Sequence, residues 1–173
     1  RDGSANFSVD NPNLFQNFWA VGAAWDLGKE DFFKVEKINS LKLKGSFGQL
    51  GNKFVPGHYL NYPGTVVGAA APFNGELNTA LESSYLNSNI HWETLDSYEG
   101  GLELSAFSNK LKFEGVYYIK KSKDLLNFVE SSGQKFFINN GSIRNNGLEL
   151  SASWNQKLGE NFSYNIGGNL TTI

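Results

Sequence analysis

The sequence of 173 residues has no cysteine. A chain without thiols has no disulfide framework, no cysteine-ligated zinc or iron–sulfur site and no thiol nucleophile. Long apolar runs are also missing. The longest nearly apolar stretch, from Val66 to Phe73, is far shorter than the roughly 18–20 residues of a membrane-spanning helix. No charged segment followed by an apolar one opens the sequence, so we expect no signal peptide at its start.

The sequence also has no large excess of charge of either sign. Fifteen Lys and Arg against 17 Asp and Glu leave a formal net charge of −2, so no basic field attracts nucleic acid and we expect no nucleic-acid partner. Proline is scarce (4 residues), whereas glycine (19 residues) and aromatic residues (14%) are abundant. This composition favours β structure. It is compatible with a membrane β-barrel, whose alternating strands produce no long apolar run.

Six segments alternate between apolar and polar residues with a period of two, which predicts strands rather than helices. One face of the six segments is apolar or small. Its positions are Trp19, Val21, Ala23, Trp25, Leu27; Leu41, Leu43, Gly45, Phe47; Tyr98, Gly100, Leu102, Leu104, Ala106; Leu111, Phe113, Gly115, Tyr117, Ile119; Leu148, Leu150, Ala152, Trp154; and Phe162, Tyr164, Ile166, Gly168, Leu170, Thr172.

The connections between these segments are of two kinds. Ser108–Lys110 and Gln156–Asn161 are short turns, and the link from Gly28 to Ser40 is longer, with a stretch at Glu30–Lys37 that could form one or two helical turns. The connections Gly51–His91 and Ser122–Gly141 have about forty and twenty residues. Structureless loops of that length are unusual in compact soluble domains. They are typical of outer-membrane barrels, in which periplasmic turns are short and extracellular loops long.

The polar face of the six segments carries the charged residues. They are Asp26, Lys42, Lys44, Glu99, Glu103, Lys112, Glu114, Lys120 and Glu149. Two interpretations fit this separation. In a soluble sandwich or calyx the apolar face points inward, and in a membrane barrel it points outward to lipid.

Three features favour the membrane barrel. Aromatic residues lie near the ends of the apolar faces, as expected at the two bilayer interfaces. The segments run about nine to thirteen residues, longer than the usual soluble strand of five or six. Uncharged polar runs such as Ser163 to Thr171 suit a wet lumen. The prediction is an all-β fold, an antiparallel transmembrane β-barrel segment of about six strands. Because the smallest such barrels have about eight strands, we expect residues 1–173 to be part of one larger barrel domain.

Several stretches resemble motifs of the SusC/RagA family of TonB-dependent outer-membrane transporters of Bacteroidetes. Ile38–Asn52 is close to I-N-x-L-K-L-R-x-S-Y-G-x-T-G-N and is the most specific match. Phe18–Trp25 takes the place of F-P-S-V-S-x-G-W, with Trp19 where the family has proline. Further matches follow the family order. They are Arg1–Phe7 with R-x-D-G-S-S-x-F, His91–Thr94 with L-K-W-E-T, Tyr117–Leu126 with Y-Y-x-K-x-T-x-D-L-L, and Asn140–Leu150 with N-x-G-x-x-x-N-x-G-x-E-L.

This resemblance implies a barrel of about twenty-two strands with an N-terminal plug. It implies a multi-pass protein of the Gram-negative outer membrane, in contact with lipid and lipopolysaccharide. Such a protein imports oligosaccharides or peptides with a SusD-like surface lipoprotein, using energy from the TonB-ExbB-ExbD complex. The plug, the TonB box and the N-terminal domain are expected outside this sequence.

Catalytic and cofactor motifs are not found. His58 and His91 are the only histidines and have no metal-binding spacing. Asp10, Asn11 and Asn13 could suggest a calcium loop, but no carboxylate follows at EF-hand spacing. Nucleotide-binding and α/β-hydrolase motifs are missing too. We therefore expect a protein that is not an enzyme, with no cofactor and no metal site.

Binding residues are expected in two places. The long connections hold the aromatic and histidine candidates for stacking on sugars or gripping peptide side chains, with packing of the loop itself or docking against the lid as the alternative. They are His58, Tyr59, Tyr62, Phe73, Tyr85 and Trp92. Charges expected to face the lumen either brace the barrel wall or plug, or contact substrate. They are Glu99, Glu103, Lys112, Glu114 and Glu149.

The main hypothesis is thus a segment of a TonB-dependent nutrient importer that works by binding and gating. Two alternatives stay open at this point. A passive porin or structural outer-membrane barrel would lack the plug and TonB box, and a soluble β-sheet binding domain would have no transport role.

Overall fold

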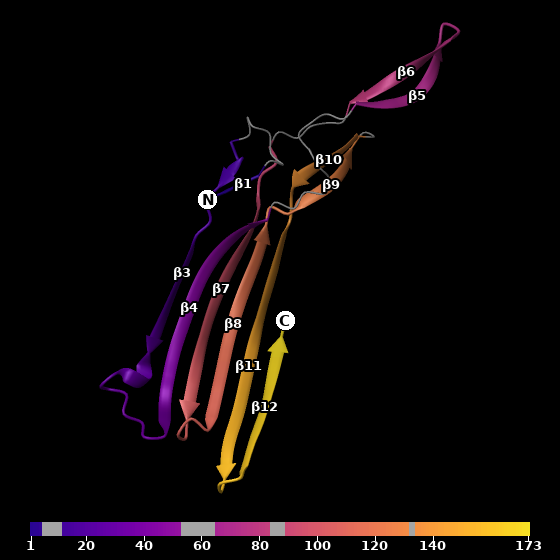
Figure 1. Cartoon of the computed structure of the whole chain (residues 1–173). Helices are drawn as coiled ribbons and strands as arrows, with labels where there is room; N and C mark the ends of the chain where they lie inside the picture. The colour runs from indigo at the N-terminus through magenta and orange to yellow at the C-terminus, as the bar shows by residue number, and fades with distance from the viewer. Residues whose placement is uncertain (5–11, 53–64, 84–88, 132–133) are drawn as a thin grey trace. The chain divides into compact units, whose positions relative to one another are not determined.

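The computed structural model describes residues 1–4, 12–52, 65–83, 89–131 and 134–173. For 65–71, 73, 77–83, 131 and 134–136 it describes the backbone only. The described chain is almost entirely antiparallel β structure, with one short 3₁₀ helix, η1, at Leu27–Lys29 (Figure 1). No helix of the described residues is long and apolar enough to cross a membrane. The strands are β1 (Asp2–Gly3), β2 (Phe15–Gln16), β3 (Ala20–Asp26), β4 (Ile38–Asn52), β5 (Thr65–Phe73), β6 (Glu76–Ser83), β7 (Glu93–Ala106), β8 (Leu111–Lys123), β9 (Leu126–Ser131), β10 (Gln134–Asn139), β11 (Ser142–Leu158) and β12 (Phe162–Thr172).

The chain divides into two compact units. We call the first the loop unit; it consists of Arg1–Phe18, Gly51–Thr94 and Ser122–Ser142. We call the second the sheet unit; it consists of Trp19–Leu50, Leu95–Lys121 and Ile143–Ile173. Each unit is described by itself below.

The sheet unit is built on a six-stranded sheet with the order β12-β11-β8-β7-β4-β3. The register confirms the two faces expected from the alternation. Val21 on β3 is paired with Phe47 on β4, and Trp154 on β11 with Ile166 on β12. Paired residues of antiparallel strands project on the same side, so the apolar positions of neighbouring strands form one continuous apolar face. We call the opposite side the charged face.

The sheet has open edges in the described chain. Its outer strands, β3 and β12, each have a sheet partner on one side only. The strands are long, from 7 residues in β3 to 17 in β11. Strands of about nine to eleven residues suffice to cross a bilayer at a tilt of about 45°. The long strands and the two open edges of the sheet agree with a portion of a barrel wall.

The three shorter connections of the sheet unit lie together at one end of the sheet (Figure 1). The β7–β8 turn places three successive residues, Phe107, Ser108 and Asn109, in the left-handed region with φ of 56°, 57° and 64°. Side chains from the neighbouring strand stabilise this turn, since Asn39 Oδ1 accepts the backbone N–H of Asn109 at 3.1 Å. The turn residues can therefore hold a backbone conformation that most L-residues avoid.

The link between β3 and β4 departs from expectation. The prediction of helical turns at Glu30–Lys37 is wrong, because the one helical turn of the link, η1, lies earlier, at Leu27–Lys29. In the later part of the link, separate hydrogen bonds from Phe33 N to Glu30 O and from Ile38 N to Val35 O close single turns. Isolated bonds of this kind do not propagate into a helix.

Both long connections contain hairpins that the sequence analysis did not predict. In the first, β5 pairs with β6 around a turn in which Asn74 and Gly75 have φ of 54° and 82°. In the second, β9 pairs with β10, and Phe128 is opposite Phe137. Positive φ at both central residues is the mark of a tight hairpin turn, for which Asn-Gly is the preferred sequence.

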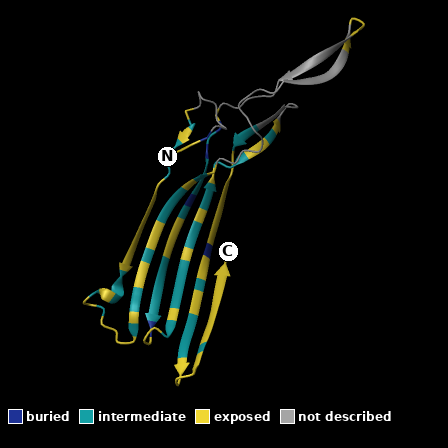
Figure 2. Cartoon of the chain, viewed as in Figure 1, coloured by how far each residue is buried: buried dark blue, intermediate teal, exposed yellow. Residues whose placement is uncertain are grey.

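Few residues of the sheet unit are buried, on either face of the sheet. Trp19 and Val21 are each 59% exposed and Ile166 is 67% exposed, and along the whole sheet the residues are mostly intermediate or exposed (Figure 2). In the described chain only Ile90, Trp92 and Ala106 are buried hydrophobic residues. Exposed apolar patches of this extent mark a surface that meets another apolar phase. A bilayer provides that phase for the outer face of a barrel.

Candidate functional site

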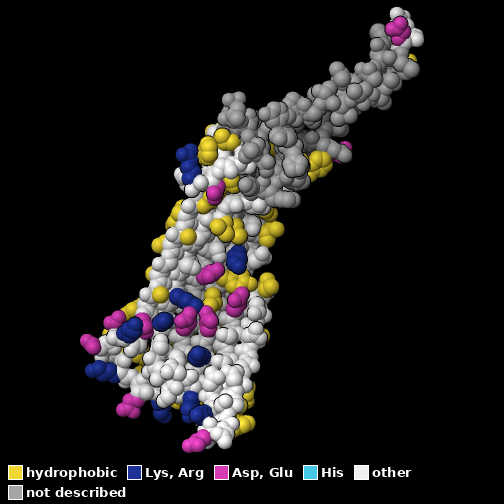
Figure 3. Space-filling model, in the orientation of Figure 1, with side chains coloured by type: hydrophobic (Ala, Val, Ile, Leu, Met, Phe, Trp, Pro, Cys, Tyr) yellow, Lys and Arg dark blue, Asp and Glu magenta, His cyan; other side chains and the backbone are white. Residues whose placement is uncertain are grey.

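The charged face of the sheet holds a three-residue cluster of charges. Lys44 on β4 lies between two carboxylates, with its Nζ 2.7 Å from Glu103 Oε1 on β7 and 2.6 Å from Glu114 Oε1 on β8. The three side chains are 36–47% exposed. Figure 3 shows basic and carboxylate side chains gathered in a band across this face. The cluster joins three neighbouring strands, although solvent weakens half-exposed pairs of this kind.

A shallow concavity lies beside this cluster. Small residues of β3, β4 and β7 form part of its lining, among them Gly22, Ser46 and Gly101. Gly101 is a position of close approach. A Cβ there would lie 2.8 Å from the carbonyl oxygen of Gly115 and 3.4 Å from Lys44 Cε. Glycine at this position therefore allows the close approach of β8, whereas the distance to Lys44 is an ordinary contact.

The predicted lumen charges gather around this part of the sheet. Glu99, Glu114 and Glu149 line the same concavity as Lys44. Lys112 lines a second shallow hollow together with Glu103 and Glu114. The sheet thus brings all five predicted charges to one face, and two of them pair directly with Lys44. This pairing fits the bracing alternative for Glu103 and Glu114.

The apolar face carries aromatic rows. The ring of Trp19, just before β3, lies with its centroid 4.7 Å from that of Phe47 on β4, which in turn lies 4.8 Å from that of Tyr98 on β7. Nearer the short turns, Phe107 contacts Trp154 at 5.8 Å. From Tyr98 to Phe107 the chain rises about 30 Å at ~3.3 Å per residue. A strand tilt of about 40° reduces this rise to about 23 Å, close to the ~25 Å apolar band of outer-membrane barrels.

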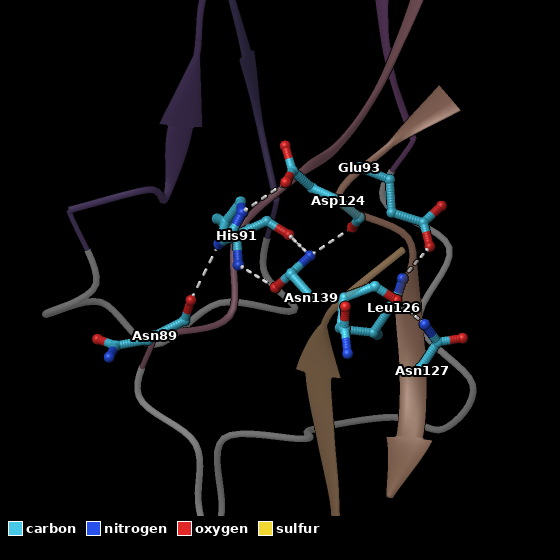
Figure 4. Close-up of polar contacts among 8 residues, drawn as sticks. Asn89, His91, Glu93, Asp124, Leu126, Asn127 and Asn139 are labelled. Atoms are coloured by element: carbon cyan, nitrogen blue, oxygen red, sulfur yellow. Dashed lines mark hydrogen bonds and ion pairs between the residues drawn. The ribbon is translucent and has the colours of Figure 1, made fainter. Parts of the chain in front are cut away.

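In the loop unit, a polar network links β9, β10 and the segment that leads into β7 (Figure 4). The side chain of Asn139 accepts the backbone N–H of His91 at 2.9 Å and donates to the carbonyls of His91 and Asp124 at 2.8 and 2.7 Å. His91 Nε2 lies 3.6 Å from Asp124 Oδ1. One amide side chain therefore holds two segments that are far apart in sequence.

Glu93 has a similar linking role. Its Oε1 accepts the backbone N–H of Leu126 at 2.7 Å, at the start of β9, and its Oε2 accepts Asn52 Nδ2 at 2.6 Å. Hydrogen bonds to an ionised acceptor are stronger than those between neutral groups. The carboxylate thereby fixes the first residue of β9 to the first residue of β7.

Trp92 lies in the small apolar core of the loop unit. It is 4% exposed, and its ring packs edge-on against Phe18 with centroids 5.5 Å apart. Its Nε1 donates to the carbonyl of Asn13 at 2.8 Å. Ile90 belongs to the same core, and Leu126 and Phe137 pack against it. These contacts fit the alternative in which Trp92 packs within the loops.

The other candidate loop residues are not brought into a site. His58, Tyr59, Tyr62 and Tyr85 lie outside the described residues, and Phe73 is the last residue of β5, with only its backbone described. As cargo contacts they stay predictions. Asp10 and Asn11 of the suggested calcium loop are also outside the described residues. Within the part of the chain that is described, no group of three or more metal-ligating side chains occurs.

Three linking residues were not among the sequence candidates. Lys44 could be placed on the charged face by its alternation, but its two partners are 59 and 70 residues away in sequence. Glu93 is part of the His91–Thr94 motif, so the sequence does single out this position. Asn139 had no such signal, because amide side chains are common in loops and nothing distinguishes one that binds a backbone.

Comparisons with known proteins agree with this architecture. The family model described as TonB dependent receptor-like, beta-barrel matches residues 1–172. A TonB-dependent receptor of Formosa agariphila is 34% identical over 169 residues, which cover 94% of this chain and 17% of that protein. The TonB-dependent receptor SusC of Bacteroides thetaiotaomicron is 26% identical over 179 residues, which cover 98% of this chain and 18% of that protein.

Solved structures are similar in fold. The RagAB peptide importer in its open-open state gives a TM-score of 0.76 at 23% identity, and in its closed-closed state 0.74 at 24% identity. Each match covers 98% of this chain and 19% of the solved chain. This chain thus spans less than a fifth of the proteins that it matches. The resemblance to the SusC/RagA family is confirmed, and the chain belongs to the TonB-dependent receptor-like β-barrel family.

Proposed function

We propose that the full-length protein is an active importer of the outer membrane, driven by TonB, and that residues 1–173 lie within its barrel domain. One observation carries the proposal. The family match over residues 1–172 coincides with a sheet whose apolar face is exposed and whose opposite face carries charges. A wall between lipid and an aqueous lumen needs this division of faces. The family match supports the importer against a soluble β-sheet domain, and the division of faces is consistent with it.

The plug and the TonB-coupling elements lie elsewhere in the protein, on this proposal. The relatives are five to six times longer than the match, since the chain covers 17–18% of them. The charged face is the side of the wall that a plug would meet. Lys44, Glu103 and Glu114 then act as a brace between strands, and Glu99 and Glu149 contact the plug or passing cargo from the concavity that they line.

The partner on the cell surface is a SusD-like lipoprotein, and the cargo is an oligosaccharide or a peptide. The solved RagAB structures are described as a peptide importer, which supports the peptide class, and the oligosaccharide class rests on the resemblance to the SusC/RagA family. Import proceeds by binding and conformational gating, with no covalent step. The loop candidates His58, Tyr59, Tyr62, Phe73 and Tyr85 contact cargo on this proposal, whereas Trp92 supports the loops from its buried position.

The decisive experiment measures uptake by cells that carry the full-length gene. The gene is deleted and complemented in its native host, and accumulation of labelled oligosaccharides and labelled peptides is measured with TonB present and absent. We expect uptake of one cargo class that requires both the gene and TonB. The complementing protein should fractionate with the outer membrane and need detergent for extraction.

Two results would contradict the proposal in different ways. Uptake that depends on the gene but not on TonB would identify a passive porin. A product that is soluble without detergent would refute the membrane barrel altogether. Deletion of a gene for a SusD-like lipoprotein of the same host, with the barrel gene kept, tests the surface partner separately.

A further inference from the structure

The link between β3 and β4, residues 27–37, is a folded segment that presents apolar side chains to solvent. Phe32 is 70% exposed and Val35 is 48% exposed. In Figure 1 the link projects from the short-turn end of the sheet, beside the end of β3. Two exposed hydrophobic residues within four positions, on a segment that holds its shape, indicate a surface that contacts another apolar phase.

Several contacts fix the link in place. Its turns are closed by the backbone hydrogen bonds from Glu30 N to Leu27 O at 3.1 Å and from Phe33 N to Glu30 O at 2.9 Å. Lys37 O accepts the backbone N–H of Phe107 at 2.8 Å, which ties the link to the β7–β8 turn. At its other end a Cβ on Gly28 would lie 3.0 Å from Leu41 N. The link is therefore held close to β4 at Gly28 and tied to the β7–β8 turn at Lys37.

Trp25 makes the link continuous with the apolar face of the sheet. This residue belongs to the apolar face and is 49% exposed. Its ring packs edge-on against Phe32, with centroids 6.2 Å apart, and its Nε1 donates to Glu30 Oε1 at 2.8 Å. A tryptophan with its ring on apolar surface and its N–H toward polar groups is the arrangement found at the membrane–water interface.

The charges of the link indicate which kind of lipid surface it can bind. Lys29, Lys34 and Lys37 alternate with the carboxylates of Glu30, Asp31 and Glu36, so the link has no net charge. Lysines that flank apolar residues extend their stems over apolar surface and place the ammonium group among phosphates. A balanced segment of this kind suits a zwitterionic headgroup layer. It lacks the excess of lysine that binding driven by anionic lipid requires.

We propose that residues 27–37 form an interfacial anchor that lies in the phospholipid headgroup layer at the short-turn end of the barrel, with Phe32 and Val35 inserted at the acyl boundary. This inference rests on the membrane placement of the barrel in the proposed function. Because short turns are periplasmic in outer-membrane barrels, the leaflet concerned is the periplasmic one.

The test uses fluorescence quenching in the full-length protein, reconstituted into vesicles of phosphatidylethanolamine with a minor fraction of phosphatidylglycerol. An environment-sensitive fluorophore is attached to Phe32→Cys or Val35→Cys in a background free of other cysteines. Val21→Cys, on the apolar face of β3, is the membrane control, and Glu160→Cys, in the β11–β12 turn, is the water control. Quenching is measured with brominated acyl chains and with iodide on both sides of the membrane.

We expect the Phe32 and Val35 labels to be quenched by brominated lipid, and iodide quenching to be at least about threefold weaker than at Glu160. Replacing phosphatidylglycerol entirely with phosphatidylethanolamine should change either value less than about twofold. Iodide quenching at Phe32 equal to that at Glu160 would overturn the anchor. Shielding from both quenchers would also overturn it, because a protein partner would then cover the link. If the Val21 label is quenched by iodide as well, the membrane placement itself fails, which separates the two failures.

Discussion

The side-chain amide of Asn139 holds the backbone of His91 at both its N–H and its carbonyl, at 2.9 and 2.8 Å. This double contact is made between residues 48 positions apart. It fixes the end of β10 to the segment that leads into β7. The asparagine side chain takes the place of a neighbouring backbone strand, because it satisfies a backbone donor and a backbone acceptor of the same residue.

Replacement of Asn139 should loosen this part of the loop unit. Asn139→Ala removes three hydrogen bonds, to His91 N, His91 O and Asp124 O. The loss of partly buried bonds should lower the local opening free energy by about 1–3 kcal/mol. Hydrogen exchange by mass spectrometry on the full-length protein should then show about tenfold or faster exchange in a peptide that spans residues 89–95.

The matched control is Asn127→Ala. Asn127 is exposed and donates one hydrogen bond, to Asn140 O, so exchange near His91 should hardly change. Equal effects of the two substitutions would show that the double contact of Asn139 adds no stability.

Glu93 allows a second prediction about the loop unit. Glu93→Ala removes both acceptors, for Leu126 N and Asn52 Nδ2. A hydrogen bond to a charged group contributes about 1.5–3 kcal/mol, so protease cleavage within β9–β10 should become clearly faster in the folded full-length protein. Glu93→Gln keeps one oxygen acceptor and should lie between the wild type and Glu93→Ala. Cleavage of Glu93→Gln as fast as that of Glu93→Ala would contradict the assigned role of the remaining oxygen.

The sheet could be predicted from the sequence more fully than the loops. Alternation placed Val21 and Phe47 on one face, and the register confirms that they are partners. A period of two identifies the face of each residue without knowledge of its neighbours. The pairing of Lys44 with Glu103 and Glu114 could not be predicted in this way. It depends on the relative register of β4, β7 and β8, which no local pattern specifies.

The hairpins of the long connections show a different limit. Residues 74–75 are Asn-Gly, a strong hairpin signal that was present in the sequence. The strand before it carries no matching signal, because the apolar residues of β5 follow one another without the period-two alternation of the other strands. For Trp92, sequence reasoning identified an aromatic residue of the loops. Only the fold shows that its ring is buried.

Lys44 is the subject of the third prediction. Lys44→Met keeps the apolar stem but leaves the carboxylates of Glu103 and Glu114 without the ammonium group that lies between them. Their mutual repulsion should lower the temperature at which the folded barrel unfolds on a heat-modifiability gel. Because all three side chains are partly exposed, the drop should be small and should shrink in 1 M salt, where the screening length falls to about 3 Å.

A second substitution tests the electrostatic origin of this effect. Glu114→Gln removes one of the two charges, so it should restore part of the stability lost in Lys44→Met, although it destabilises the wild type. A loss in Lys44→Met that persists unchanged in high salt, with no rescue by Glu114→Gln, would show that Lys44 acts through packing of its stem.

The neighbouring glycines Gly100 and Gly101 on β7 differ sharply in the space available for an added methyl group. A Cβ at Gly101 would lie 2.8 Å from the carbonyl oxygen of Gly115 and 3.1 Å from Val116 Cγ2, whereas a Cβ at Gly100 would have no atom within 4 Å. A backbone carbonyl cannot rotate away, so Gly101→Ala must displace β7 from β8, at a cost of about 1–3 kcal/mol. Gly100→Ala adds a methyl group in open space on the opposite face, and its effect should stay within about 0.5 kcal/mol.

Both glycine variants are compared by the midpoint temperature of heat-modifiability in the full-length barrel. Gly101→Ala should also weaken the contact of Lys44 with Glu103 and Glu114, since separating β7 from β8 at the 2.8 Å contact with Gly115 O moves the two carboxylates apart. Its midpoint should therefore respond less to added salt than that of the wild type, a change that Gly100→Ala should not produce. Equal midpoints for the two variants would mean that β7 and β8 can separate freely at this point. The close approach at Gly101 would then have no part in holding the charged face together.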